Sequence, residues 1–153
     1  MKTELTIQDP FTIGMEFAYY DLRWRILRKP WGQPRGTERD ELESDCIHRV
    51  VVNDAGAPLA CARLQLNSQE EAQLRYMAVE PDARRSGVGR MLLIAMEDIA
   101  LSAGAERMVL QAREGSVQFY AACGYTIVQE TFVLYGTIRH FLMEKVLVVS
   151  HAL

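Results

Sequence analysis

Residues 77–93 (MAVEPDARRSGVGRMLL) place glycines and arginines where the apolar pattern changes from that of a strand to that of a helix. The pattern predicts a strand over 72–79, and helical spacing from Val88 predicts a helix over 88–103. The first amides of a helix have no intrahelical acceptor and lie at the positive end of the helix dipole, so they attract anions. This junction is therefore a candidate phosphate-binding loop.

The residue types in the loop suit a diphosphate. Gly87 and Gly89 let an anion approach the backbone closely and permit backbone angles that other residues avoid. Three cationic side chains surround them, and these belong to Arg84, Arg85 and Arg90. The sequence therefore offers both amide donors and positive charge to a diphosphate.

Two well-known phosphate loops do not fit this segment. The P-loop pattern GxxxxGK[ST] is absent, and the dinucleotide fingerprint GxGxxG needs a glycine where Leu92 stands. The pattern that remains is R-x-x-G-x-G between a strand and a helix. A plain strand–helix turn with surface arginines has the same pattern, so the residues of this loop alone leave both interpretations open.

The elements that must position this loop alternate between strands and helices. A helix is predicted over 15–29, ending before Pro30, and its apolar face is formed by Phe17, Tyr20, Leu22, Trp24 and Leu27. Further strands are predicted over 46–53, 58–67 and 106–112, followed by two closing strands in YTIVQE and RHFLMEKVLVV. A second short helix is predicted over 116–123, ending at Gly124, and the acidic run 38–44 is interpreted as a short solvated helix.

These elements predict an α+β fold with a mixed, mostly antiparallel central sheet and helices on both faces. The turn between 53 and 58 indicates a hairpin, and the crossover over 72–112 should contain a parallel strand pair. A length of 153 residues fits a single domain over 1–153, with a core at about 5–147.

Composition excludes several classes of function. The net charge of −3 gives no reason to expect nucleic acid or an anionic membrane as a partner, and no apolar run reaches the length of a membrane span. The cysteines and histidines do not show the spacing of a metal site, so no metal is predicted. The odd number of cysteines and the absence of a signal-like N-terminal segment favour reduced thiols and a cytoplasmic location.

Four segments together resemble the GNAT family of N-acetyltransferases. The loop at 84–89 resembles the family's motif A, [QR]-x-x-G-x-[GA], and QFYAACGY (118–125) resembles its FYxxxG[FY] segment. GTIRHFLMEK (136–145) is similar to the closing strand of a bacterial subgroup, and LRWRILRKPWG (22–32) to that subgroup's first helix and loop. The resemblance covers nearly the whole chain in the same order.

The resemblance implies acetyl-CoA as cosubstrate, bound mainly through backbone groups. The pantetheine arm would bond to the strand at Met77, Ala78 and Val79, where two parallel strands splay apart. The diphosphate would lie on the loop and helix start at Arg84, Arg85, Ser86, Gly87, Val88, Gly89 and Arg90. The side chains of Met77 and Val79 are expected in the core.

The resemblance also implies roles in the reaction. Tyr120 stands where the family commonly has a tyrosine that protonates the departing thiolate, and a phenol with a pKa of about 10 suits a thiol with a pKa near 8.5. An aromatic core pair with Phe119 is the alternative for Tyr120. Some members have a glutamate base at the position of Gln73, which cannot act as one. The remaining candidates for the base are water, His140, Glu70, Glu71 and Glu130, and of these His140 has the ordinary pKa best suited to the task.

The resulting prediction is an acetyl-CoA-dependent N-acetyltransferase that acts by direct transfer on a primary amine of a small-molecule, amino-acid-like or peptide acceptor. The alternatives are a non-catalytic module that binds or senses acyl-CoA, and an enzyme that uses a longer acyl donor. A homodimer is compatible with the resemblance.

Overall fold

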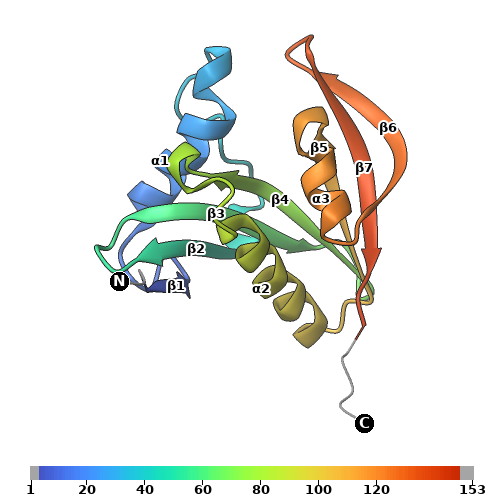
Figure 1. The fold of residues 1–153 in the computed structure, drawn as a ribbon, viewed down its shortest axis with the longest axis horizontal. Coiled ribbons are helices and arrows are strands. Elements are labelled where there is room, and N and C mark those ends of the chain that lie inside the picture. The colour runs from blue at the N-terminus through green and yellow to red at the C-terminus, as the bar shows by residue number, and fades with distance from the viewer. Residues whose placement is uncertain (1–3, 149–153) are drawn as a thin grey trace. The chain divides into compact units, whose positions relative to one another are not determined.

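A computed structural model describes residues 4–148 of the chain, which form seven strands and three α-helices (Figure 1). In chain order these are β1 (Leu5–Gln8), α1 (Glu16–Leu27), β2 (Ile47–Asn53), β3 (Pro58–Leu66), β4 (Glu71–Val79), α2 (Val88–Ser102), β5 (Arg107–Arg113), α3 (Val117–Ala122), β6 (Thr126–Leu134) and β7 (Ile138–Val146).

The strand order is β1-β2-β3-β4-β5-β7-β6. β2 pairs antiparallel with β1 and with β3, which confirms the predicted hairpin, and β7 pairs antiparallel with β5 and with β6. β4 and β5 pair in parallel, with Glu71–Leu74 opposite Arg107–Leu110. The predicted α+β class with a mostly antiparallel sheet and one parallel crossover is confirmed.

The described chain divides into two compact units. One contains residues up to Gln65 together with Tyr76–Met96, and the other contains Leu66–Arg75 and the residues from Glu97 onward. β4 and α2 each contribute to both units, since the divisions fall between Arg75 and Tyr76 and between Met96 and Glu97. A single domain over 1–153 stays a prediction, and residues 1–3 and 149–153 lie outside the described part.

In the first unit, α1 packs on β2, β3 and β4. Tyr19, Tyr20 and Leu22 form a buried cluster with strand residues Val50, Val52, Cys61 and Ala78. The predicted helix is confirmed, but its face was partly wrong, because Phe17 is 75% exposed and the charged Arg23 is fully buried instead. The helix therefore buries a polar group whose charge must be satisfied nearby.

In the second unit, β5 lies beside β7, and β7 lies beside β6 (Figure 1). On β5, the side chains of Met108, Leu110 and Ala112 are buried. Met143 on β7 is also buried and lies opposite Leu110. β6 is the last strand in the order and is exposed along almost its whole length.

Two segments differ from the sequence-based expectation. β1 was not predicted, because its four residues, LTIQ, are at the lower limit of length for an alternation that indicates a strand. The acidic run is not a solvated helix: only Glu43–Asp45 forms a 3-10 turn, and Glu38 is buried. The carboxylates of Asp40 and Glu43 instead pair with buried arginines, which determines the shape of this loop.

Candidate functional site

The predicted phosphate loop combines two residues in the left-handed conformation with the start of α2. After a 3-10 turn at Pro81–Ala83, the backbone takes positive φ values at Arg85 (63°) and Gly87 (88°). The Ser86 hydroxyl donates to the carbonyl of Ala83 and closes the turn. A Cβ added at Gly87 would meet no atom within 4 Å, so glycine is required there by its backbone angle and not by lack of space.

The same loop presents the first amides of α2. The Met91 N–H donates to the Gly87 carbonyl at 3.0 Å, so Gly87 is the N-cap of the helix. The amides of Val88, Gly89 and Arg90 follow the cap and have no acceptor within the helix. The first turn contains no acidic residue, and no carboxylate of that turn competes with an anion for these amides.

Exposure separates backbone from side-chain roles in the loop. Arg84, Arg85 and Arg90 are exposed, as expected for side chains that attract a phosphate from solvent. Val88 is buried, so its side chain belongs to the core and only its amide could contact a ligand. The arrangement can bind a diphosphate through amides and guanidinium groups together.

The predicted strand residues Met77, Ala78 and Val79 lie in β4, in the same unit as the loop. The Glu80 N–H donates to the Leu59 carbonyl of β3 at 2.8 Å. The amide of Ala78 hydrogen-bonds the thiol of Cys61, which also lies in β3. Backbone groups of successive strand residues point to opposite edges. The amides of Met77 and Val79 therefore point to the edge of β4 that faces away from β3.

Tyr120 lies in α3, in the other unit, and is 8% exposed. Its ring packs edge-to-face on Phe119 and on Tyr125, with centroids 5.1 and 5.9 Å away. Burial raises the pKa of Tyr120, so its hydroxyl keeps its proton at neutral pH. Both the catalytic and the core interpretation of this residue remain compatible with the packing.

The turn after Tyr120 is held by an ionic contact. The Lys145 ammonium donates to the Cys123 carbonyl at 2.9 Å and to both oxygens of Glu97, at 3.0 and 3.2 Å. A Cβ added at Gly124 would lie 3.2 Å from the Lys145 Cε, and the φ of Gly124 is 98°. The positive φ and this close contact explain the glycine in the FYAACGY segment.

His140 is a buried residue of β7, paired with Arg113 of β5. Its Nδ1 donates to the Ile138 carbonyl at 3.0 Å, and its ring stacks on Phe132 with centroids 4.2 Å apart. Because a carbonyl only accepts, Nδ1 carries the proton and Nε2 carries the lone pair in the neutral ring. The neutral ring of His140 can therefore act as a base, and the same ring also packs against Phe132.

The other candidate bases have charged or polar partners. Hydrogen bonds from Asn67 and Arg107 lower the pKa of Glu71, and a hydrogen bond from Arg139 lowers that of the exposed Glu130. Both carboxylates are therefore weaker bases than ordinary ones. The amide of Gln73, at the position of the family's glutamate, accepts a hydrogen bond from Asn67 at 3.0 Å.

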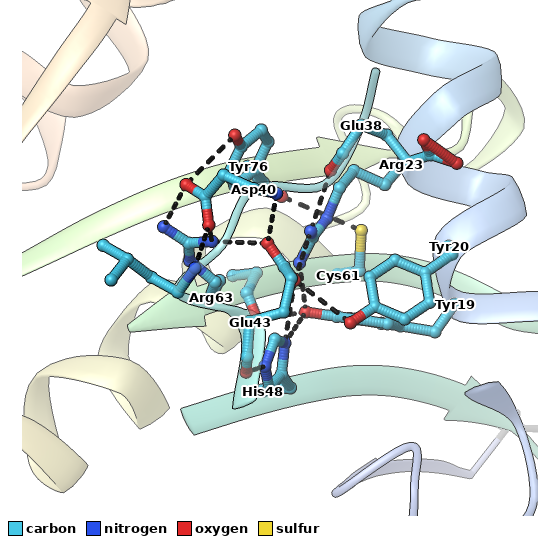
Figure 2. A network of polar contacts seen from close by, with 12 residues as sticks. Tyr19, Tyr20, Arg23, Glu38, Asp40, Glu43, His48, Cys61, Arg63 and Tyr76 are labelled. Atoms are coloured by element: carbon cyan, nitrogen blue, oxygen red, sulfur yellow. Dashed lines mark hydrogen bonds and ion pairs between the residues drawn. The ribbon is translucent and has the colours of Figure 1, made fainter. Parts of the chain in front are cut away.

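A buried ionic network in the first unit was not found from the sequence (Figure 2). The fully buried guanidinium of Arg63 donates to Asp40 and to Glu43, and the equally buried Arg23 donates to Glu43 at 2.8 Å and to the Glu38 carbonyl at 2.9 Å. Burial works to raise the pKa of Glu43, but the two arginines outweigh it and hold that pKa below its usual value. The network connects α1, β3 and the acidic loop.

The network continues to β2 through a histidine. The Nε2 of His48 donates to the Glu43 carbonyl at 2.7 Å, and its Nδ1 accepts from the hydroxyl of Tyr19 at 2.7 Å. Arg23 donates to the oxygen of the same hydroxyl. Burial lowers the pKa of His48, which favours the neutral ring beside two arginines. The run of acidic residues at 38–44 was visible in the sequence, but the arginines that pair with it are 15 or more residues away, so the pairing could not be predicted.

A cavity of about 710 Å³ opens beside this network, between the start of α1 and the loop leading into β2. Phe11, Tyr20 and His48 form aromatic parts of its wall, and Arg39 and Glu43 contribute charge. Glu43 and His48 use their polar atoms in the network itself. The network therefore forms part of the cavity wall, and Asp9, Glu16 and Arg49 add further charged groups to it.

Within residues 4–148, no group of three or more His, Cys, Asp or Glu side chains is arranged to hold a metal ion. Among the same residues, no helix is long and apolar enough to cross a membrane.

Comparison with known proteins gives consistent matches. The acetyltransferase (GNAT) family matches residues 17–125. The uncharacterized N-acetyltransferase YjcF of Bacillus subtilis is 31% identical over 128 residues, which cover 84% of this chain and 89% of YjcF.

Two crystal structures share the fold. An acyl-CoA N-acyltransferase from Pseudomonas aeruginosa has a TM-score of 0.76 and 22% identity, covering 94% of this chain and 99% of that one. A GNAT family acetyltransferase from Elizabethkingia anophelis with acetyl-CoA bound has a TM-score of 0.70 and 17% identity, covering 95% and 100%. These identities are low, so the two structures support the fold alone.

Proposed function

Because the chain belongs to the acetyltransferase (GNAT) family, as the resemblance predicted, we propose that it transfers an acetyl group from acetyl-CoA directly to a primary amine. The acceptor would be a small molecule, an amino-acid-like compound or a peptide. Acetyl transfer follows from the family, whereas the donor, the acceptor and the residue roles below belong to the proposal.

The observation that carries the proposal is the start of α2. Gly87 caps the helix in a conformation that suits glycine, the next three amides have no intrahelical acceptor, and the adjacent arginines are exposed. A diphosphate with several negative charges matches this set of donors. A solved structure of the same fold holds acetyl-CoA, and the proposal takes acetyl-CoA as the cosubstrate of this chain as well.

The proposed reaction has two bond changes. The lone pair of a neutral amine attacks the thioester carbon, a C–N bond forms, and the carbonyl oxygen becomes an oxyanion. A backbone N–H of β4 stabilises this oxyanion. The direction of the strand assigns this role to Met77 or Val79, because Ala78 points to β3.

The C–S bond then breaks and the CoA sulfur leaves as a thiolate. In the proposal, the Tyr120 hydroxyl supplies the proton that turns this thiolate into a thiol. Burial raises the pKa of Tyr120, so the phenol is protonated at neutral pH but is a weaker acid than an exposed one. The ammonium that forms on the acceptor loses a proton to water or to His140, whose neutral ring carries its lone pair on Nε2. No acyl-enzyme is formed.

Two measurements test the proposal. Acetyl-CoA and CoA should raise the melting temperature while ATP and NAD do not, with a stabilisation of about 2.7 kcal/mol at 100 times the dissociation constant. Thiol release from acetyl-CoA in the presence of a panel of primary amines should then identify an acceptor. A folded sample that neither shifts nor releases thiol would remove the proposal.

The same experiment separates the alternatives. Binding of acetyl-CoA without thiol release for any amine would favour a non-catalytic acyl-CoA-binding module. Faster release from a longer acyl-CoA would change the donor and keep the enzyme.

A further inference from the structure

Tyr76 has an unusual backbone conformation inside β4. Its φ is +53°, in the left-handed region that non-glycine residues avoid, although the strand continues to Val79. The parallel pairing with β5 ends at Leu74, two residues earlier. A left-handed residue within a strand is typical of a β-bulge, where glycine is the usual occupant. A tyrosine at this position needs contacts that hold it there.

The side chain of Tyr76 provides these contacts. Its ring lies 4.5 Å from the guanidinium carbon of Arg23 and 4.8 Å from that of Arg63, both fully buried side chains. Its hydroxyl donates to Asp40 at 3.5 Å (Figure 2). Cation–π contacts strengthen when the cation is removed from water. The ring is therefore bound to the ionic network described above.

The network keeps this geometry at a cost in hydrogen bonding. Within residues 4–148, the Nε atoms of Arg23 and Arg63 are buried and have no hydrogen-bond acceptor. Such unsatisfied donors are rare in folded proteins, so each one calls for an explanation. Here the guanidinium groups contact the Tyr76 ring while their terminal nitrogens bond to Asp40 and Glu43.

We propose that Tyr76 is a positioning residue for acetyl transfer. The two arginines hold its ring, the ring holds the left-handed step of β4, and this step directs the amides of Met77 and Val79 towards the thioester. This inference rests on the proposed function, because it adds a residue to the same site. In this proposal the ionic network acts on the position of the β4 amides, whereas the start of α2 binds the diphosphate without it.

The test compares three substitutions of Tyr76 with one control. Tyr76→Leu removes the cation–π contacts, and Tyr76→Gly removes them while relieving the positive φ, so Tyr76→Gly should fold even if Tyr76→Leu does not. Tyr76→Phe keeps the ring. The control is Tyr20→Leu, which removes ring contacts with Arg23 and Arg39 and a hydrogen bond to Glu43 but changes a residue of α1 and none of β4.

Four quantities are measured: kcat with the best amine of the panel, KM for acetyl-CoA, the dissociation constant of CoA, and the melting temperature. A misplaced reactive group lowers rates by about 100-fold, so kcat should fall by about 10–100-fold in Tyr76→Leu and Tyr76→Gly. The affinity for CoA should persist, because the loop before α2 is unchanged. Tyr76→Phe should restore kcat to near that of the parent, and Tyr20→Leu should lower only the melting temperature.

Several results would overturn the inference. One is a kcat near that of the parent in Tyr76→Leu and Tyr76→Gly, and another is an equal loss of kcat in Tyr20→Leu. Failure of both Tyr76→Leu and Tyr76→Gly to fold would assign Tyr76 to stability alone. A parent protein without CoA binding or thiol release would instead overturn the proposed function, so the two failures are distinguishable.

Discussion

The hydroxyl of Tyr125 donates a 2.8 Å hydrogen bond to the buried carboxylate of Glu97. Tyr125 also donates its backbone N–H to the carbonyl of Tyr120 at 3.1 Å, and the two rings are in contact. Because Lys145 of β7 donates to both oxygens of Glu97, one carboxylate connects the residue that follows α3 with β7. Tyr125 and Glu97 thus help to orient Tyr120 without themselves needing to contact a substrate.

The substitution Tyr125→Phe tests this support. The ring remains, but the buried carboxylate of Glu97 loses one donor, so the free energy of unfolding should fall by about 1–3 kcal/mol. The activity should fall much less than in Tyr120→Phe, since no proton donor is removed. Chemical denaturation checks the first statement and initial rates check the second. Unchanged stability would show that Lys145 alone satisfies Glu97.

The substitution Tyr120→Phe removes only the proposed proton donor. General acid catalysis contributes about 10²–10⁴-fold, so kcat should fall by that factor while the dissociation constant of CoA stays constant. Tyr135→Phe, in the turn between β6 and β7, is the matched control. An unchanged kcat, with chemistry limiting the rate, would assign Tyr120 to the core.

Local features of this protein could be predicted from sequence, whereas long-range charge pairs could not. Gly87 and Gly124 adopt the positive φ values for which glycine is suited, so the glycine itself is a signal that can be recognised in the sequence. Arg63 gives no such signal: its partners Asp40 and Glu43 are 23 and 20 residues away. An arginine in a strand is usually expected to be exposed, but Arg63 is fully buried.

The same limit explains the error on α1. Its spacing predicted a buried apolar face that included Phe17. In the structure, the face that contains Arg23 is buried instead, and Phe17 is exposed to solvent. Periodicity reports which residues share a face and not which face is buried when a buried ion pair competes with an aromatic ring. The boundaries of α2 and β5 were predicted closely because their apolar patterns have no such competition.

The ionic network should be sensitive to the loss of a single carboxylate. In Glu43→Gln, two buried guanidinium groups lose a charged partner, and breaking a buried pair costs about 3–5 kcal/mol. The exposed Glu41→Gln is the control and should change stability by less than about 0.5 kcal/mol. Denaturation of both variants at pH 7 checks the difference. Equal stabilities would mean that Asp40 and solvent compensate both arginines.

Stability should fall at both ends of the pH range. The pKa of Glu43 is lowered in the folded state, so its contribution is present above its unfolded pKa of about 4.3 and is lost as the pH decreases below that value. Burial raises the pKa of Tyr19, Tyr120 and Tyr125 above the unfolded value of about 10. Above pH 10 the unfolded chain binds fewer protons than the folded one, so stability should fall by up to about 1.4 kcal/mol per pH unit for each of these tyrosines. Thermal unfolding across pH 3–11 checks both slopes, and a flat profile above pH 10 would contradict the burial of these rings.

The substitution Gly89→Val tests the start of α2 without a large effect on folding. Gly89 is the second residue of the helix, where valine has a somewhat better helix propensity than glycine, so stability should change by less than about 1 kcal/mol. Its side chain would stand where the proposed diphosphate meets the amides, and a lost charge-assisted hydrogen bond costs about 1.5–3 kcal/mol. The dissociation constant of CoA should therefore rise by about 10–150-fold.

Ser102→Val places the same side chain in the last turn of the same helix and should leave CoA affinity unchanged. Calorimetric titration of both variants measures the difference. If Gly89→Val binds CoA as tightly as the parent, the diphosphate does not lie on these amides, and the glycine serves only the turn between β4 and α2.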